Sequence, residues 1–332
     1  MAWYGFNMQW MLVGGGRRPL PPDERALDFL SGLDFNFVRM PTDYRTWTTG
    51  FDYGHPDESV FATLDDHLVA CRLRGIHLSL NLHRAPGYCI TRNDLERDNL
   101  WLDRVAQDGF VGLWEGFARR YLGTAAEALS FDLLNEPPAI GLDGFTRDRH
   151  AALIRRTVAA IRAIDPDRPI VIDGLDGGNL AMPELADLGI IHGGRGYQPY
   201  PVSHWGAEWW DGWKGGDAPR YPGVEFEGTT WGPAALRAFY EPWRAVERTG
   251  VGVHIGELGC YNRTPNDDAM RWFRDLFGLF REFGWGWAMW NLEGPFGIVG
   301  HGRPGARIEM RHGYPVDVDL LELMLSSRIS QE

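Results

Sequence analysis

The stretch ALSFDLLNEP, residues 128–137, decides the fold class of this chain. Its apolar part, 128–134, predicts a buried strand, because short apolar runs bounded by turn residues are typical of parallel sheets. Asn135 and Glu136 follow at once, and the amphipathic stretch 148–164 comes next. The order of strand, polar strand end and helix predicts one unit of an α/β fold.

The same order recurs along the whole chain. Further apolar runs predict strands at 3–9, 35–40, 77–82, 170–173, 189–197, 252–257 and 286–291. Amphipathic periodicity predicts helices at 23–33, 59–74, 102–121, 148–164, 233–248 and 267–282. Eight such strands predict an α/β protein with a (β/α)8 barrel, forming one catalytic domain over residues 1–332. A doubly wound open sheet is the alternative, but no glycine-rich dinucleotide fingerprint follows any predicted strand.

One connection is unusually long. Residues 198–231, after the sixth predicted strand, hold five tryptophans and many glycines and prolines. Long loops inside a compact domain are usually functional. In a barrel this loop is expected at the C-terminal face, where active sites lie.

Composition narrows the function classes. The net charge is −12 and there is no run of Lys and Arg, so we expect no nucleic-acid partner. No segment holds eighteen consecutive apolar residues, so no membrane partner is expected either. Three cysteines and an N-terminus without a signal-peptide pattern lead us to expect a cytoplasmic protein. The 15 tryptophans fit either a large core or sugar-binding surfaces.

Two glutamates stand at predicted strand ends, Glu136 after the fourth strand and Glu257 after the seventh. Polar groups at the C-terminal ends of barrel strands are typical of catalytic sites. A pair of carboxyl groups suits cleavage of a glycosidic bond, since one donates a proton and the other attacks the anomeric carbon. The alternative is that each glutamate is a structural partner of an arginine.

The sequence resembles glycoside hydrolase family 5, the cellulase A family. The segments that carry the resemblance are FNFVRMP (35–41), LNLHRAPG (80–87), FDLLNEP (131–137), HIGELG (254–259) and WAMWNLEG (287–294). They occur in the family's order and span most of the chain. The resemblance implies a retaining mechanism with the catalytic carboxyl groups about 5–5.5 Å apart.

The resemblance also implies residue roles. Glu136 would be the general acid/base and Glu257 the nucleophile, with Arg39 and Tyr197 as hydrogen-bond donors to Glu257. Asn135 would bind the sugar 2-hydroxyl, Trp290 would lie under the reacting sugar, and His83 would orient the sugar or the arginine. The full set of expected substrate-binding residues is Arg39, His83, Asn135, Arg195, Tyr197, His204, Trp205 and Trp290. No metal and no cofactor are expected.

One position departs from the family pattern. The family usually has His-x-Tyr on the sixth strand, whereas this chain has Arg195, Gly196 and Tyr197. The following segment VSHWGA, 202–207, is similar to the family's sequence there and supports the alignment. Arg195 is always charged and cannot exchange a proton, but it can donate to the nucleophile or to a substrate hydroxyl.

The substrate is less constrained than the reaction. The long tryptophan-rich loop suggests a closed groove, and some subgroups of the family are exo-acting β-mannosidases. We therefore expect an exo-β-mannosidase acting on short β-1,4-mannosides, with Man-β-1,4-GlcNAc as one candidate. The alternative is an exo- or endo-β-glucanase. A non-catalytic sugar-binding barrel is the hypothesis from another class, and the presence of Asn135, Glu136 and Glu257 argues against it.

Overall fold

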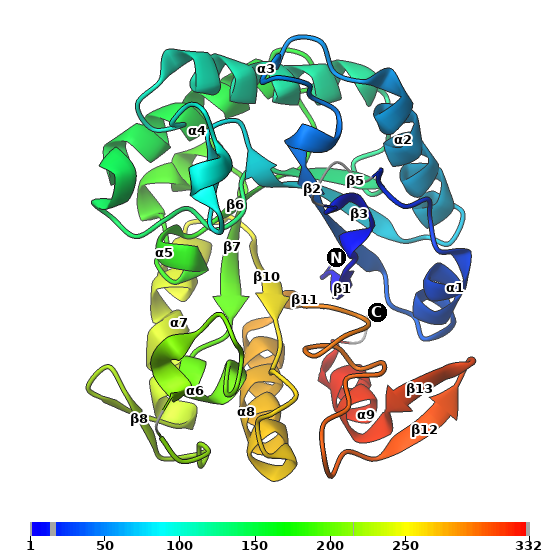
Figure 1. Ribbon diagram of the computed structural model, residues 1–332, viewed down its shortest axis with the longest axis vertical. Helices are drawn as coiled ribbons and strands as arrows, with labels where there is room; N and C mark the ends of the chain where they lie inside the picture. The colour runs from blue at the N-terminus through cyan, green and yellow to red at the C-terminus, as the bar shows by residue number, and fades with distance from the viewer. Residues whose placement is uncertain (1, 14–17, 215, 330–332) are drawn as a thin grey trace. The chain divides into compact units, whose positions relative to one another are not determined.

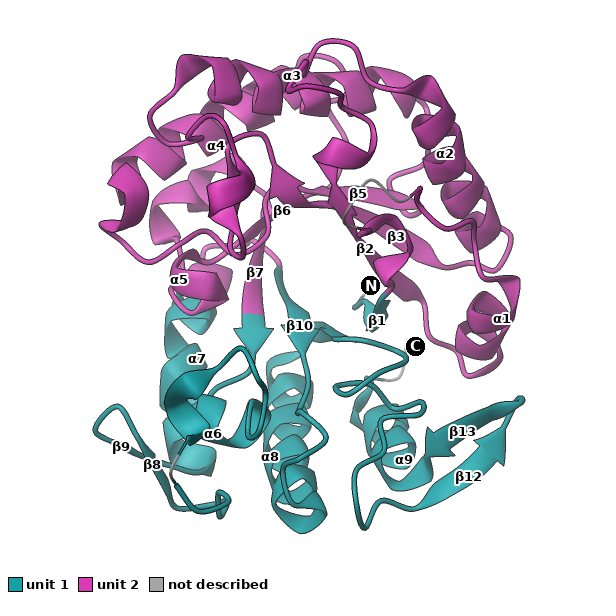
Figure 2. Cartoon of the chain, in the orientation of Figure 1, with its two compact units in different colours: residues 1–7, 195–245, 253–332 teal, residues 8–194, 246–252 magenta. Residues whose placement is uncertain are grey.

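The computed structural model describes residues 2–13, 18–214 and 216–329. Two compact units divide the chain, and Figure 2 shows them in different colours. Unit 1 comprises residues 1–7, 195–245 and 253–332, and unit 2 comprises residues 8–194 and 246–252.

Unit 2 is built on parallel strands. In spatial order they are β2 (Phe37–Asp43), β3 (His77–Ala85), β5 (Leu129–Asp132), β6 (Ile170–Asp173) and β7 (Ile191–Gly196), the last ending in unit 1. The short strand β4 (Tyr88–Cys89) folds back antiparallel onto the end of β3. Nearly every residue of these parallel strands is buried, which is typical of sheets covered on both faces.

Helices connect these strands and cover the sheet of unit 2 on its outer side (Figure 1). They are α1 (Glu24–Gly32), α2 (Glu58–Arg72), α3 (Arg104–Arg120), α4 (Arg147–Arg162) and the short α5 (Leu175–Gly178). Single-turn helices lie at Gln9–Met11, Tyr44–Thr46, Asn93–Leu95 and Leu142–Gly144, and a longer 3-10 helix at Pro183–Leu188. Side-chain caps fix helix starts: the Thr146 hydroxyl accepts from the Arg149 amide at the start of α4.

Unit 1 contains the parallel strands β1 (Tyr4–Asn7), β11 (Gly286–Met289) and β10 (Val253–Leu258), with β11 between the other two. Its helices are α6 (Tyr200–Ser203), α7 (Pro233–Glu247), α8 (Asn266–Phe283) and α9 (Val318–Ser327), with a single turn at Asp211–Trp213. Two antiparallel hairpins complete it: β8 (Val224–Phe226) with β9 (Thr229–Trp231), and β12 (Ile308–Arg311) with β13 (Tyr314–Asp317).

Each strand and helix predicted from the sequence is present, with ends shifted by a few residues. The segment 198–231 is more ordered than the predicted loop, since it contains α6 and the β8–β9 hairpin. The β12–β13 hairpin and α9 were not predicted. Both hairpin strands are only four residues long and β12 is mostly exposed, so neither forms the longer apolar run by which a strand is recognised.

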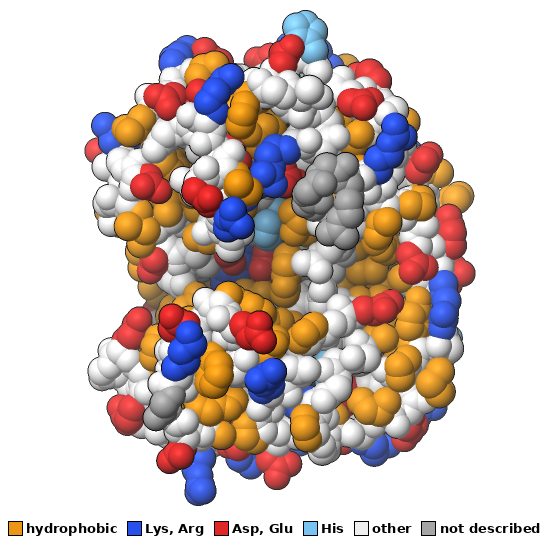
Figure 3. All heavy atoms as spheres, viewed as in Figure 1, with side chains coloured by type: hydrophobic (Ala, Val, Ile, Leu, Met, Phe, Trp, Pro, Cys, Tyr) orange, Lys and Arg blue, Asp and Glu red, His pale blue; other side chains and the backbone are white. Residues whose placement is uncertain are grey.

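Charged side chains on the surface are largely paired. Arg74 contacts Glu24 and Asp28, and Arg155 contacts Asp187. On the face shown in Figure 3, acidic and basic side chains lie interspersed with hydrophobic ones. Within the described ranges, no helix combines the length and the apolar character needed to span a lipid bilayer.

Candidate active site

Three predicted site residues of unit 2 come from neighbouring strands. Arg39 lies in β2, where its side chain is buried, and Asn135 follows β5. The Arg39 guanidinium donates to the Asn135 Oδ1 at 3.0 Å and to the Asp132 carboxylate at 2.6 Å. His83 is half-buried near the end of β3. Arg39 thus fixes the Asn135 amide with its oxygen toward the guanidinium.

Asp132 and Asp173, which are not among the predicted site residues, hold the Arg39 guanidinium in this position. Asp132 ends β5 and Asp173 ends β6. The Asp173 carboxylate lies 3.6 Å from the Arg39 guanidinium and accepts the backbone N–H of Glu136 at 3.0 Å. Both aspartates could have been recognised in the sequence, because each is an acidic residue at the last position of its strand. Barrel enzymes place functional groups at that position.

Glu136 has an unusual backbone. Its φ is +46°, in the left-handed region that residues with a Cβ adopt at a cost of about 1 kcal/mol or more. Its side chain is half-buried. The Tyr88 hydroxyl donates to the Glu136 carbonyl at 2.6 Å. Burial, followed by the negative charge of Glu136, raises the pKa of Tyr88 well above its usual value, so Tyr88 stays a donor.

In unit 1, Glu257 lies in β10 with two donors on its carboxylate. The Tyr197 hydroxyl donates to Oε2 at 3.0 Å, and the Arg195 guanidinium lies 3.3 Å from Oε1. Tyr197 and Arg195, both expected site residues, thus lie against the same carboxylate. Both carboxylate oxygens of Glu257 therefore have a polar partner in unit 1.

Aromatic residues surround Tyr197. Its ring packs edge-on against His204 at 5.1 Å and against Phe296 at 6.2 Å. The Ser203 hydroxyl lies 2.8 Å from the His204 Nδ1, and burial lowers the pKa of His204 to about 4. Trp209, also in contact with Phe296, is 65% exposed. His204 and Trp209, which follow β7, therefore form an aromatic cluster with Phe296 beside Tyr197, a donor to Glu257.

The last two predicted residues also lie in unit 1. Trp205 is half-buried, and its ring meets Trp213 at 6.0 Å. Trp290 is half-buried directly after β11, and its backbone N–H donates to the Leu258 carbonyl at 2.7 Å. This bond ties the position of Trp290 to the end of the strand that carries Glu257.

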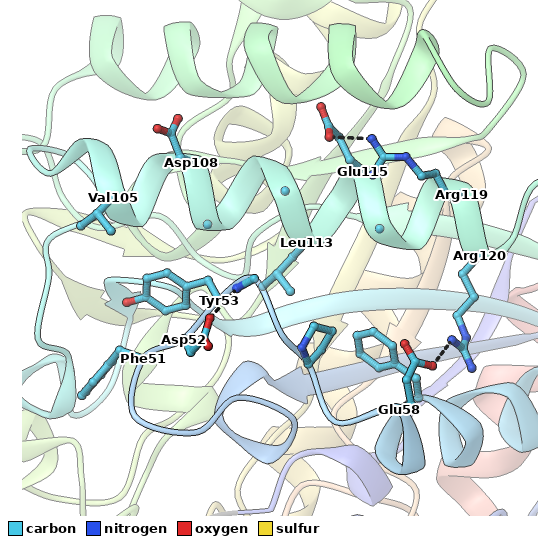
Figure 4. A pocket seen from close by; sticks show the side chains of 16 residues that line it. Phe51, Asp52, Tyr53, Glu58, Val105, Asp108, Leu113, Glu115, Arg119 and Arg120 are labelled. Carbon is cyan, nitrogen blue, oxygen red and sulfur yellow. Dashed lines mark hydrogen bonds and ion pairs between the residues drawn. The ribbon is translucent and has the colours of Figure 1, made fainter.

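A groove of about 690 Å³ lies elsewhere, on the outer surface of unit 2 (Figure 4). The α3 glycines Gly109, Gly112 and Gly116 line it, together with Phe51 and Tyr53. Charged pairs flank it, among them Glu115 with Arg119. Its described lining residues include none of the predicted site residues, so this groove is separate from the candidate active site.

Comparison with solved structures gives the fold class. A crystal structure described as that of a glycoside hydrolase is 59% identical, covers 99% of this chain and 100% of its own, and superposes with a TM-score of 0.97. The endoglucanase Cel5A of Thermotoga maritima superposes with a TM-score of 0.75 at 21% identity, over 97% of this chain and 96% of its own. The chain has the predicted (β/α)8 barrel fold.

Carboxylates at barrel strand ends are typical of glycoside hydrolases. Sequence comparison gives the same class of protein. Residues 1–295 match the model of the cellulase family, glycosyl hydrolase family 5. The chain belongs to this family, and it is an O-glycoside hydrolase of the retaining type. Endoglucanase C of Acetivibrio thermocellus is 26% identical over 81% of this chain and 83% of its own length. Cellodextrinase A of Ruminococcus flavefaciens is 25% identical over 79% and 75%, respectively.

Proposed function

We propose that Glu257 is the nucleophile and Glu136 the general acid/base of a β-glycosidase whose single catalytic domain spans residues 1–332. The observation that carries the proposal is the pair of donors on the Glu257 carboxylate, Tyr197 at 3.0 Å and Arg195 at 3.3 Å. They hold the carboxylate of Glu257 near the end of β10. Each glutamate lies at or just beyond the C-terminal part of its strand, where barrel enzymes place catalytic groups.

The proposed reaction has two displacements. The Glu257 carboxylate forms a bond to the anomeric carbon while the glycosidic bond breaks, and Glu136 gives its proton to the departing oxygen. Glu136, now ionised, then takes a proton from water, whose oxygen displaces Glu257 from the anomeric carbon. One carboxyl group must be ionised and the other protonated, so we expect a bell-shaped activity profile between pH 4 and 9.

The remaining site residues are proposed to hold the sugar. Because Arg39 occupies the Asn135 oxygen at 3.0 Å, the Asn135 NH₂ is proposed to donate to the sugar 2-hydroxyl. That contact strengthens as charge develops on the ring. Trp290 is proposed to lie under the reacting sugar. His83, His204 and Trp205 are proposed to contact sugar hydroxyls or ring faces.

The proposed substrates are short β-1,4-linked oligosaccharides. Glucose-series sugars are the first candidate, because the relatives that cover most of this chain are an endoglucanase and a cellodextrinase. Mannose-series sugars, including Man-β-1,4-GlcNAc, remain the candidate predicted from the sequence. Exo action is proposed in either case, with the aromatic residues His204, Trp209 and Phe296 beside Tyr197 proposed to close one end of the sugar site.

A product profile tests the substrate proposal. The enzyme is incubated separately with cellohexaose, mannohexaose and Man-β-1,4-GlcNAc, and the products are separated by chromatography. Stepwise release of monosaccharide supports exo action, and the series that is cleaved identifies the sugar. Products from the middle of the chain would contradict exo action. Failure on all three substrates would contradict the proposed linkage class.

Two substitutions test the residue roles. Glu257→Gln should abolish turnover while sugar binding, measured by calorimetry, persists. Glu136→Ala should lose far more activity on an oligosaccharide than on a 2,4-dinitrophenyl glycoside, whose leaving group needs no proton. Full turnover by Glu257→Gln would contradict the assignment.

A further inference from the structure

The backbone of Glu136 is held at both of its polar groups. Its N–H donates to the Asp173 carboxylate at 3.0 Å, and its carbonyl accepts from the Tyr88 hydroxyl at 2.6 Å. The residue has a φ of +46° and precedes Pro137, whose ring disfavours helical backbone at the preceding position. Such a conformation persists only where the surrounding structure determines it.

Tyr88 is itself fixed in place. It lies in β4, is 3% exposed, and pairs with Ala85 across the turn that joins β3 and β4. Its ring packs edge-on against Trp101 at 5.1 Å. The turn is tight at Gly87, where φ is +74° and a Cβ would lie 2.6 Å from the Leu100 nitrogen. The tyrosine ring therefore has a defined place from which its hydroxyl reaches the Glu136 carbonyl.

Asp173 is fixed in a similar way. It ends β6, its side chain is buried, and its carboxylate also lies 3.6 Å from the Arg39 guanidinium. Arg39 in turn holds Asn135 at 3.0 Å. The same carboxylate therefore links the backbone of Glu136 to the residue that orients Asn135.

We infer that Tyr88 and Asp173 are positioning residues that aim the Glu136 carboxyl group by fixing its left-handed backbone. The inference rests on the proposed acid/base role of Glu136. Neither residue is required to touch the sugar. Their loss should impair proton transfer to the leaving group more than attack by the nucleophile.

The test compares leaving groups. Tyr88→Phe keeps the ring and removes only the hydrogen bond to the Glu136 carbonyl. We expect kcat/KM to fall about tenfold on an oligosaccharide, as for the loss of one hydrogen bond, and less than about threefold on the matching 2,4-dinitrophenyl glycoside. Tyr121→Phe is the matched control: Tyr121 is 4% exposed in the same unit, and its hydroxyl contacts Asp65 at 3.0 Å. It should change neither rate.

Asp173 gives a second measurement that does not depend on Tyr88. Asp173→Asn keeps an oxygen that accepts the Glu136 N–H, so it should retain more oligosaccharide activity than Asp173→Ala. Azide should accelerate turnover of the dinitrophenyl glycoside by Asp173→Ala, because an anion that needs no general base replaces water in the second displacement. Equal activities of the two variants, without azide acceleration, would overturn the role of Asp173.

The result for Glu136→Ala distinguishes a failure of the positioning role of Tyr88 from a failure of the acid/base role of Glu136. If Glu136→Ala shows the leaving-group dependence and Tyr88→Phe loses activity equally on both substrates, or on neither, the positioning role of Tyr88 is wrong. If Glu136→Ala itself shows no such dependence, the acid/base role of Glu136 is wrong and the positioning role is overturned with it.

Discussion

The guanidinium of Arg195 lies 3.3 Å from the carboxylate of Glu257, and the two side chains are 0% and 5% exposed. At position 195 the family usually has a histidine, whereas this chain has an arginine that pairs with Glu257. An arginine keeps its charge at every pH at which the fold is expected to survive. The charge on Glu257 is therefore compensated by a partner that does not titrate.

Removing Arg195 should destabilise the fold. Arg195→Met leaves a buried carboxylate without its cation, so the free energy of unfolding should fall by about 3 kcal/mol. Urea denaturation at pH 7 measures the change. The double variant Arg195→Met/Glu257→Gln removes both charges and should recover part of the loss. A double variant no more stable than Arg195→Met alone would show that the pair does not couple.

Tyr197→Phe should lower activity in a protein that still folds. The substitution removes the 3.0 Å hydrogen bond to Glu257 and keeps the ring packed against His204 and Phe296. A hydrogen bond to a charged group contributes about 1.5–3 kcal/mol, so kcat/KM should fall about tenfold to hundredfold. Tyr221→Phe is the control, since its hydroxyl donates to Asp275 in the same unit. Equal losses in the two variants would argue against a specific role for Tyr197.

Buried histidines should make unit 2 sensitive to acid. Burial lowers the pKa of His67, His77 and His192 to about 4, and that of His150 to about 3. Between about pH 6.5 and pH 4 the unfolded chain binds protons at these groups and the folded chain does not. The free energy of unfolding should therefore fall as pH decreases through this window, by roughly 2 kcal/mol per histidine at pH 5.

Urea denaturation at pH 7 and pH 5 measures this effect. His150→Phe removes one titrating group in contact with Trp101 and Phe145, so the difference between the two pH values should shrink. His55→Gln is the control, because the His55 side chain is 87% exposed. Equal stability of the unsubstituted protein at pH 5 and pH 7 would contradict the prediction.

The fold was largely predictable because its signal is local. Most core strands are short segments rich in apolar residues and most helices are amphipathic, so the alternation of strand and helix indicates a barrel. The β12–β13 hairpin escaped prediction because its strands are only four residues long and because Ile308 and Met310 are exposed. The segment 198–231 was predicted as a loop because its glycines and prolines obscure α6 and the β8–β9 hairpin.

The candidate site was predictable only in part. Glu136 and Glu257 were found because each follows an apolar run, and Arg195 was noticed as a departure from a family pattern. The contacts of Asp173 and Tyr88 with the Glu136 backbone were not predicted. They join residues that are 37 and 48 positions apart in the sequence. They also depend on the positive φ of Glu136, which the amino-acid type at this position does not predict.

The central claim is that Glu257 forms a covalent bond to the sugar. The most direct measurement is mass spectrometry of the intact enzyme after incubation with a 2,4-dinitrophenyl 2-deoxy-2-fluoro-β-glycoside of the cleaved series, followed by peptide mapping. We expect one added glycosyl group per chain, on the peptide that contains Glu257, and no addition to Glu257→Gln. A label on another carboxylate, or an inactivated enzyme without any label, would contradict it.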